Sequence, residues 1–147
     1  MSSLLLDTTV LIDALRGRAA ADRLRRLREG SDPPYVCAIN VEELWRGSRP
    51  AEEPAIRQLL SGLRVAPLGA EEGEMAGRWR LAFSTKGKTL SQADCLIAAA
   101  AVRIGANLAT GNPGDFPMSE LVVEEWPVGE GRQEPGDGAR ATPKQEL

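Results

Sequence analysis

The chain has 147 residues, 42% of them hydrophobic, and a formal net charge of −3. This size and apolar content suit one domain with one core, and the acidic balance argues against a protein that holds nucleic acid by bulk positive charge. The sequence has no histidine, which removes the commonest general base and the commonest zinc ligand, so any catalysis must use carboxylates, hydroxyls, lysine or arginine.

Apolar patterning in the first half of the chain predicts strands that alternate with helices. Leu4-Leu5-Leu6 is a continuous apolar run, which is typical of a strand buried on both faces. In chain order we expect a strand at 4–6, a helix over 10–15, a basic amphipathic helix at 19–28, a strand at 35–39, a helix at 41–47 capped by Asn40, a break at 50–54 and a helix at 55–63.

The second half continues this alternation. We expect a strand at 64–68, a helix at 71–83, a turn at 86–88, a helix from Ser91 to Gly105, a strand at 107–110, a loop at 111–117 and a strand at 121–123. Residues 128–147 are rich in Gly, Pro, Glu and Arg and lack an apolar period, which predicts a disordered tail behind a domain at 1–127.

Strands that alternate with helices predict a three-layer α/β/α sandwich around a central, mainly parallel sheet of four to five strands. The N-terminus lacks the pattern of a signal peptide, and the longest apolar run, 95–102, is far short of the ~20 residues that span a bilayer. Cys37 and Cys95 lie among apolar residues, as buried thiols do in a reducing compartment. We therefore expect a cytoplasmic protein with no membrane partner.

In open sheets of this kind, ligands sit at the carboxyl ends of the strands. Four acidic residues fall near that edge. Asp7 follows the first strand, Glu43 lies on the helix after the second, Asp94 is in the first turn of the helix before the fourth, and Asp115 follows the fourth. None is persuasive alone, but their joint placement predicts that they meet at one site.

Each acid also has a simple structural explanation. Asp7 could cap the following helix, and Ser91 with Asp94 resembles a capping box. Glu43 could pair with an arginine at 46 or 49 on a solvated helix face, and Asp115 lies in a good turn sequence. If the four acids instead converge, their mutual repulsion favours a bound cation, and oxygen-only ligands without histidine favour Mg²⁺ or Mn²⁺.

Four segments carry a resemblance to a known family. They are Leu5-Leu6-Asp7-Thr8-Thr9-Val10-Leu11-Ile12-Asp13, Ala38-Ile39-Asn40-Val41-Glu42-Glu43-Leu44-Trp45-Arg46-Gly47, Leu90-Ser91-Gln92-Ala93-Asp94-Cys95-Leu96-Ile97-Ala98-Ala99 and Leu108-Ala109-Thr110-Gly111-Asn112-Pro113-Gly114-Asp115-Phe116. In this order and spacing they resemble the acidic motifs of PIN-domain proteins, above all the VapC-like toxins of toxin–antitoxin pairs. The alignment puts Glu43, not Glu42, in the metal position.

This resemblance implies a Mg²⁺-dependent endoribonuclease in which Asp7, Glu43, Asp94 and Asp115 are both catalytic and metal-binding residues. It also implies a homodimer and a VapB-like antitoxin, with promoter DNA bound only through the toxin–antitoxin complex. Two features depart from the family pattern. Pro113-Gly114 precedes Asp115, which makes that acid the least secure direct ligand, and the tail after Pro127 has no counterpart.

Polar and basic residues supply candidates for substrate contacts. Thr9 could orient a ligand or a water beside Asp7, and Asn112 follows the fourth strand. The helix at 19–28 is rich in arginine, and we expect Arg25 and Arg26 to guide RNA or to pair with an acidic antitoxin. The simpler explanation of this charge run is a solvated helix face.

Two other classes of function stay open at this stage. A non-catalytic PIN-like protein would bind RNA or a partner without cutting, although an intact set of four acids argues against it. A receiver-like signalling domain would need a lysine at a late strand end, where this chain has Thr110-Gly111-Asn112. A third class, a phosphatase with an aspartate nucleophile, is disfavoured, because it would need a second aspartate at position 9, where this chain has Thr9.

Overall fold

The computed structural model describes residues 3–30 and 32–129. Five parallel strands form one sheet in the order β3-β2-β1-β4-β5. The strands are β1 (Leu4–Leu6), β2 (Tyr35–Val36), β3 (Arg64–Val65), β4 (Asn107–Thr110) and β5 (Val123–Glu125). Within this sheet Leu6 is paired with Ala109, so the chain leaves β1 and β4 side by side at the same edge. The predicted parallel α/β fold is confirmed.

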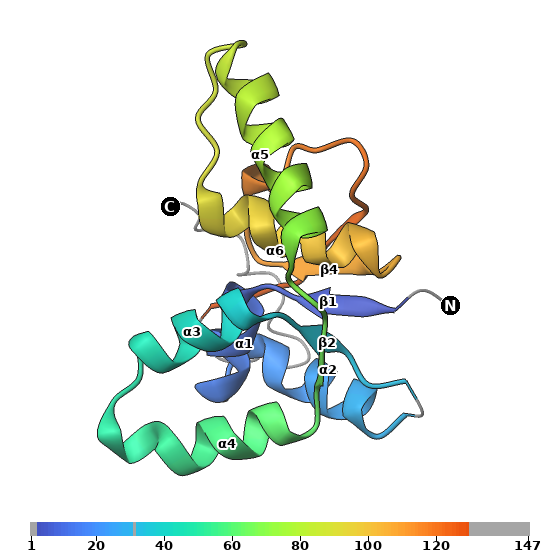
Figure 1. Cartoon of the computed structure of the whole chain (residues 1–147). Coiled ribbons are helices and arrows are strands. Elements are labelled where there is room, and N and C mark those ends of the chain that lie inside the picture. Colours follow the sequence, from blue (N-terminus) through green and yellow to red (C-terminus); the bar gives the residue numbers. More distant parts are fainter. Residues whose placement is uncertain (1–2, 31, 130–147) are drawn as a thin grey trace, which may run out of the picture.

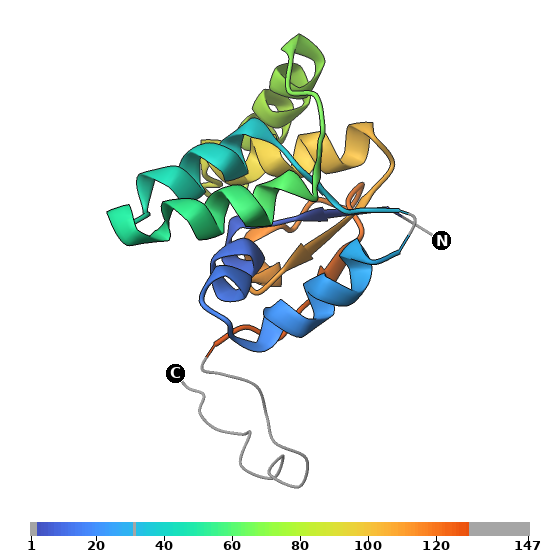
Figure 2. The same ribbon diagram turned by 90° about the horizontal axis from the view of Figure 1, so that it is seen from below.

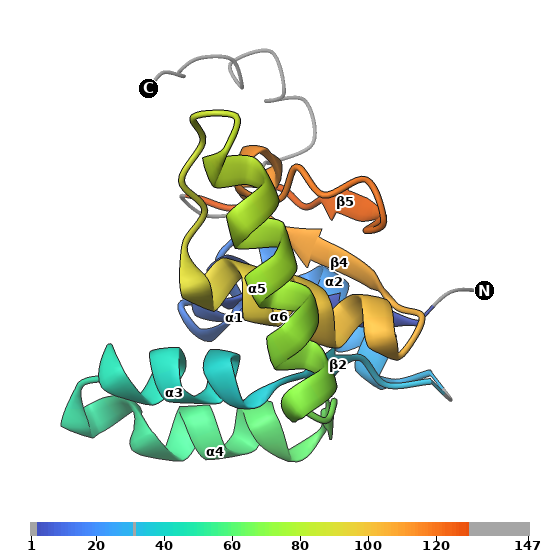
Figure 3. The same ribbon diagram turned by 45° about the horizontal axis from the view of Figure 1, so that its top comes forward.

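Helices cover both faces of the sheet (Figures 1 and 2). One face carries α1 (Thr8–Leu15) and α2 (Ala19–Arg28), and the other carries α5 (Ala70–Ser84) and α6 (Gln92–Arg103). The antiparallel pair α3 (Ala38–Arg46) and α4 (Glu53–Ser61) packs beside α1 (Figures 1 and 3). Two short 3₁₀ turns, η1 (Pro50–Glu52) and η2 (Pro113–Asp115), complete the element order.

The sheet separates two hydrophobic clusters because successive strand residues point to opposite faces. Leu5 and Leu108 belong to the cluster under α5 and α6, whereas Leu6 and Ala109 belong to the cluster under α1 and α2. The central run 98–101 of α6 consists of alanines that are 0% exposed, so this helix lies close against the sheet. Burial of each large side chain in these clusters stabilises the fold by about 1.5–3 kcal/mol.

Several predicted boundaries are wrong, and the third strand, expected at 64–68, is only Arg64–Val65. The second strand ends at Val36, because Ala38 and Ile39 already form the first turn of α3. Asn40 is therefore not the N-cap; Cys37 holds that position, and Asn40 Oδ1 accepts a 2.8 Å hydrogen bond from the Cys37 amide. At the other end of the domain, β5 begins at Val123 rather than at 121.

The last described residues, Val128 and Gly129, contact the domain, while residues 130–147 of the predicted tail lie outside the described residues. The domain boundary at 127 and the disorder of the tail stay predictions. Both cysteines are free and buried, as the sequence predicts. Across residues 3–30 and 32–129, no helix has the length and apolar character needed to cross a bilayer.

Candidate acid site at the carboxyl edge of the sheet

Asp7 lies where β1 and β4 end side by side. Its backbone amide donates a 2.9 Å hydrogen bond to the carbonyl of Ala109, and its side chain is buried. Asp7 occupies the N-cap position of α1, but its carboxylate makes no capping hydrogen bond. Instead, Oδ2 accepts one hydrogen bond from Thr9 Oγ1 at 3.0 Å and another from Thr110 Oγ1 at 2.7 Å. The capping explanation of Asp7 is therefore not what the structure shows.

The two threonine hydroxyls are themselves oriented by the loop after β4. Thr9 Oγ1 accepts from the Gly111 amide at 3.0 Å, and Thr110 Oγ1 accepts from the Asn112 amide at 2.9 Å. A hydroxyl has a single proton to donate. Because an amide already donates to each oxygen, both protons are directed to Asp7. Thr9 is thus placed beside Asp7 as predicted, whereas Asn112 contacts the site through its backbone.

Glu43 reaches the same region from α3 through a chain of hydrogen bonds among partly buried polar groups. Its Oε1 accepts a 2.6 Å hydrogen bond from Thr8 Oγ1. Asn40 Nδ2 in turn donates to Thr8 Oγ1 at 3.1 Å, and the Asn40 side chain is 0% exposed. The nearby arginines have other partners, since Arg46 pairs with Glu42 and Arg49 pairs with Glu52. The simple pairing proposed for Glu43 with Arg46 or Arg49 is therefore not observed.

Asp94 is placed by the start of α6, where the Ser91 side chain accepts a 3.0 Å hydrogen bond from the Asp94 amide. Burial is the main cause that raises the pKa of the Asp94 carboxyl, although its hydrogen bond with Ser91 acts in the opposite direction. The negative charges of Asp7, Asp115 and Glu43 also raise the Asp94 pKa, in that order of size. Interactions between charges weaken with distance, so Asp7, Asp115 and Glu43, although distant in sequence, lie close enough to Asp94 to disfavour its charged form.

Asp115 belongs to this group despite the Pro113-Gly114 insertion before it. Pro113 opens the 3₁₀ turn η2, and Asp115 ends it with an exposed side chain. Its influence on the Asp94 pKa follows that of Asp7 and precedes that of Glu43. The turn explanation of Asp115 is thus correct for its backbone, and the carboxylate lies near enough to Asp94 to raise the pKa of that residue.

The chemistry of this donor set suits a hard divalent cation. All four candidate ligands are carboxylates, and Asp94 is partly buried among like charges that a cation would neutralise. Within the described part of the chain, however, no three Asp, Glu, His or Cys side chains already stand in a group that could hold a metal ion. A bound cation would therefore need side-chain adjustment or bridging waters, which Mg²⁺ commonly retains.

Arg25 and Arg26 lie away from these acids, in the last turn of α2. Arg25 forms an ion pair with Asp22, and Arg26 lines a cleft together with Leu4 and Asn107, the first residues of β1 and β4. That cleft is at the amino edge of the sheet, opposite the edge where Asp7 lies. The structure thus does not bring these two arginines to the acid site.

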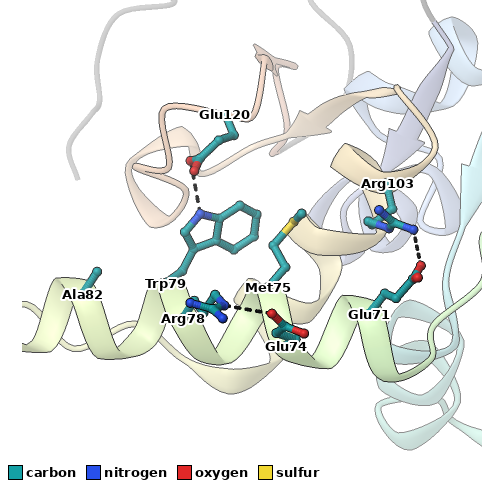
Figure 4. Close-up of a pocket in the computed structure, with 8 residues that line it drawn as sticks. All are labelled: Glu71, Glu74, Met75, Arg78, Trp79, Ala82, Arg103 and Glu120. Carbon is teal, nitrogen blue, oxygen red and sulfur yellow. Dashed lines mark hydrogen bonds and ion pairs between the residues drawn. The ribbon is translucent and has the colours of Figure 1, made fainter.

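A second cavity, of about 500 Å³, is lined by none of the four acids (Figure 4). Its lining residues are Glu71, Glu74, Met75, Arg78, Trp79, Ala82, Arg103 and Glu120. Its arginines are paired, Arg78 with Glu74 and Arg103 with Glu71, and the Trp79 indole donates to Glu120 at 3.1 Å. Because these polar groups already satisfy one another, the cavity offers little for phosphate chemistry.

Three polar residues that support the acids were not predicted to belong to the site, namely Thr8, Asn40 and Thr110. Thr110 was detectable, since it ends β4 beside the end of β1. Asn40 was interpreted as a helix cap, whereas it is the third residue of α3. A Cys-x-x-Asn spacing at a helix start was the available signal for its hydrogen bond to the Cys37 amide.

Comparisons with known proteins agree with this geometry. A sequence model of the PIN domain matches residues 4–117. Ribonuclease VapC10 of Mycobacterium tuberculosis is 36% identical over 130 residues, which cover 85% of this chain and 94% of that protein. Ribonuclease VapC19 of the same species is 30% identical over 115 residues, covering 78% and 92%.

Solved structures show the same fold. The Rickettsia felis VapBC2 complex, bound to a DNA fragment from its promoter, matches with a TM-score of 0.74 and 23% identity over 84% of this chain and 98% of that one. The Neisseria gonorrhoeae FitAcB structure matches with a TM-score of 0.67 and 26% identity, covering 82% and 95%.

Proposed function

The chain belongs to the PIN-domain family, and from this premise we propose that it is a metal-dependent endoribonuclease that acts as the toxin of a toxin–antitoxin pair. The observation that carries the proposal is the shared environment of Asp7, Glu43, Asp94 and Asp115 at the carboxyl edge of a parallel sheet. The names of relatives that are 30% and 36% identical, both ribonucleases, support the same activity.

Mg²⁺, or Mn²⁺ in its place, is the cofactor that suits these residues. Asp7, Glu43, Asp94 and Asp115 would hold it, because oxygen ligands and the lack of histidine fit a hard cation better than Zn²⁺. When bound, such a cation lowers the pKa of a coordinated water and stabilises negative charge on phosphate oxygens. Loss of a carboxylate ligand is expected to cost several kcal/mol of transition-state stabilisation.

The protein's own contribution is to orient the acids before substrate arrives. Thr9 and Thr110 donate hydrogen bonds to Oδ2 of Asp7, and Thr8 donates one to Oε1 of Glu43. Ser91 caps α6 by accepting a hydrogen bond from the Asp94 amide. Hydrogen bonds that hold a reactive group in place reduce the reorganisation needed during reaction. Thr9, oriented by the Gly111 amide, is the candidate for a contact with substrate or water; Asn112 lies beside it in the loop after β4.

The partners follow from the relatives. Structures of similar fold are toxin–antitoxin complexes, and one is bound to promoter DNA. We therefore expect a VapB-like antitoxin that covers the acid site, promoter DNA bound only through the complex, and a homodimer of this chain in the cytoplasm. Arg25 and Arg26 would contact RNA or the antitoxin at the amino edge of the sheet, away from the acids.

The direct test is cleavage of purified total RNA with sequencing of the new ends. We expect cleavage by the wild-type protein with Mg²⁺, none with EDTA, and at least 100-fold slower cleavage by Asp94→Asn, on the order of one lost metal ligand. Glu53→Gln, an exposed acid on α4, is the matched control and should cleave normally. RNA binding without cleavage by the wild-type protein would instead support the non-catalytic alternative.

A further inference from the structure

The four residues Trp126–Gly129 that follow β5 lie across α1 and the loop after β4, and we call them the C-terminal strap. We propose that Asp13 and Val128 are positioning residues that act on Asp7 through this strap. The proposal rests on the ribonuclease function proposed above. It concerns a buried carboxylate outside the set of four acids, together with a chain segment that sequence analysis placed in a disordered tail from residue 128.

The strap is anchored at its first residue to β4. The Trp126 amide donates a 2.9 Å hydrogen bond to the carbonyl of Thr110. The Trp126 side chain is 1% exposed, and the guanidinium of Arg23 lies 4.4 Å from the centre of its ring. This end of the strap is therefore held both by the sheet and by α2, beside the threonine whose hydroxyl reaches Asp7.

Asp13 anchors the other end. Its side chain is 3% exposed, and each carboxylate oxygen accepts a hydrogen bond from a backbone amide. Oδ1 accepts from Gly129 at 2.7 Å, and Oδ2 accepts from Ala20, the first residue of α2, also at 2.7 Å. Charge-assisted hydrogen bonds of this kind are short and strong. One buried carboxylate on α1 thus fixes the start of α2 and the end of the strap together.

Between these two ends of the strap, the side chain of Val128 packs against Gly111. A Cβ atom at position 111 would lie only 2.6 Å from Val128 Cγ2 and 3.0 Å from Cγ1. Val128 therefore occupies the space beside Gly111. The amide of Gly111 donates to Thr9 Oγ1, and Thr9 Oγ1 donates to Asp7 Oδ2, both at 3.0 Å. The position of the strap is transmitted to Asp7 through these contacts.

The first test replaces Asp13 by Asn, which keeps the size of the side chain but leaves one of the two amides without an acceptor. We expect kcat for RNA cleavage to fall on the order of 10-fold or more, as for sub-ångström to 1 Å misplacement of a reactive group. KM should change less than about twofold, because the strap acts on the position of Asp7 and does not supply a group that binds RNA. Glu53→Gln, an exposed acid, is the control and should keep both constants.

The second test does not depend on a buried charge. Gly111→Ala should lower kcat, because its Cβ collides with Val128, and adding Val128→Ala should restore it at least partly. The Thr9 amide resonance in a ¹H–¹⁵N spectrum should move in Asp13→Asn and in Gly111→Ala and should return toward its original place in the double variant, because Thr9 accepts from the residue-111 amide and is itself unchanged. A purely structural role for the strap would lower the unfolding midpoint without this paired change and rescue.

Unchanged kcat in folded Asp13→Asn and Gly111→Ala, beside an active wild-type protein, would overturn the strap proposal. A rescue by Val128→Ala that restores stability but not kcat would also contradict it. Failure of the ribonuclease proposal looks different, since the wild-type protein itself would then cleave no RNA with Mg²⁺. In that case the Thr9 amide resonance still tests whether the strap acts on the hydrogen bonds that join residue 111, Thr9 and Asp7.

Discussion

The hydroxyl of Thr110 donates a 2.7 Å hydrogen bond to Oδ2 of Asp7, across a separation of 103 residues in the chain. The parallel pairing of β1 with β4 makes this contact possible, because Leu6 lies beside Ala109 and the next residue of each strand falls at the same edge. The carboxylate on which the proposed reaction depends is thus oriented by a residue from the other end of the domain.

Thr110→Val removes this hydroxyl while keeping the shape of a β-branched side chain. A hydrogen bond to a charged group contributes about 1.5–3 kcal/mol, so we expect kcat/KM for RNA cleavage to fall on the order of 10- to 100-fold. Thr110→Ser retains the hydroxyl and should stay within a few-fold of the wild-type protein. Equal activity in the valine and serine variants would show that the hydrogen bond does not matter for cleavage.

The fold could be predicted from local signals, and the same signals selected the four acids as candidates for the site. The continuous apolar run at 4–6 predicted β1 at its observed bounds, and the basic amphipathic pattern predicted α2 at Ala19–Arg28. The strand expected at 107–110 also matches β4. Strand ends in a parallel sheet meet at one edge, so acids placed after them could be expected to converge. The raised pKa of Asp94, to which Asp7, Asp115 and Glu43 contribute, agrees with that expectation.

Contacts between distant segments could not be predicted in the same way. The apolar residues after Tyr35 suit a strand as well as the buried first turn of α3, and only packing decides between them. Arg25 and Arg26 were assigned by charge alone, and charge does not reveal which edge of the sheet a helix end reaches. The partner of Asp13 is Gly129, 116 residues away, with no local pattern to indicate it.

The raised pKa of Asp94 predicts a conflict between stability and activity. Burial, followed by the charges of Asp7, Asp115 and Glu43, favours the protonated carboxyl in the folded state. The pKa of Asp94 is therefore higher in the folded state than in the unfolded state. Its contribution to the free energy of unfolding is fully present below the unfolded-state pKa. That contribution is lost as the pH rises through the folded-state pKa. At neutral pH and without metal, Asp94→Asn should unfold at a higher temperature than the wild-type protein, although we expect it to cleave RNA far more slowly when Mg²⁺ is present.

Thermal unfolding of both proteins in EDTA at several pH values measures this effect. The difference between them should grow as pH rises from the acid range toward neutrality and should be smallest where Asp94 is protonated in the folded protein. Glu53→Gln serves as the control, because its ion pair with Arg57 is exposed and should show little pH-dependent difference. A less stable Asp94→Asn variant at neutral pH would contradict the proposed repulsion among the acids.

Removal or addition of the cation should change the stability of the wild-type protein. A ligand that binds only the folded state stabilises it by about 2.7 kcal/mol at 100 times its dissociation constant. Mg²⁺ should therefore raise the unfolding midpoint relative to EDTA, and the rise should be lost in Asp7→Asn and in Asp94→Asn. NaCl at the same ionic strength controls for screening of the acids. An equal rise in the variants and the wild-type protein would place the cation elsewhere.

The two cysteines should be inert toward thiol reagents in the folded protein. Burial is the main cause that raises the pKa of both Cys37 and Cys95, and only the thiolate reacts. We expect iodoacetamide at pH 8 to label neither residue in the folded protein and both residues in urea, as counted by mass spectrometry. Rapid labelling of either cysteine under native conditions would show that its surroundings open readily.

Asn40 should be the most costly amide of the domain to replace. It is 0% exposed, accepts from the Cys37 amide at 2.8 Å and donates to Thr8 Oγ1 at 3.1 Å, which in turn donates to Glu43. Asn40→Ala leaves the buried Cys37 amide without its acceptor, for an expected loss of about 1–3 kcal/mol in the free energy of unfolding.

Asn40→Asp separates the two functions of this amide. The carboxylate can still accept from the Cys37 amide, but it cannot donate to Thr8, and it places a buried negative charge near Glu43. We therefore expect Asn40→Asp to lose RNA cleavage as well as stability in urea titrations at neutral pH, with the stability loss reduced at acid pH, where the new carboxyl is protonated. Gln58→Ala, an exposed amide on α4, should stay within about 0.5 kcal/mol of the wild-type protein. Full activity of Asn40→Asp would mean that Thr8 orients Glu43 without help from Asn40.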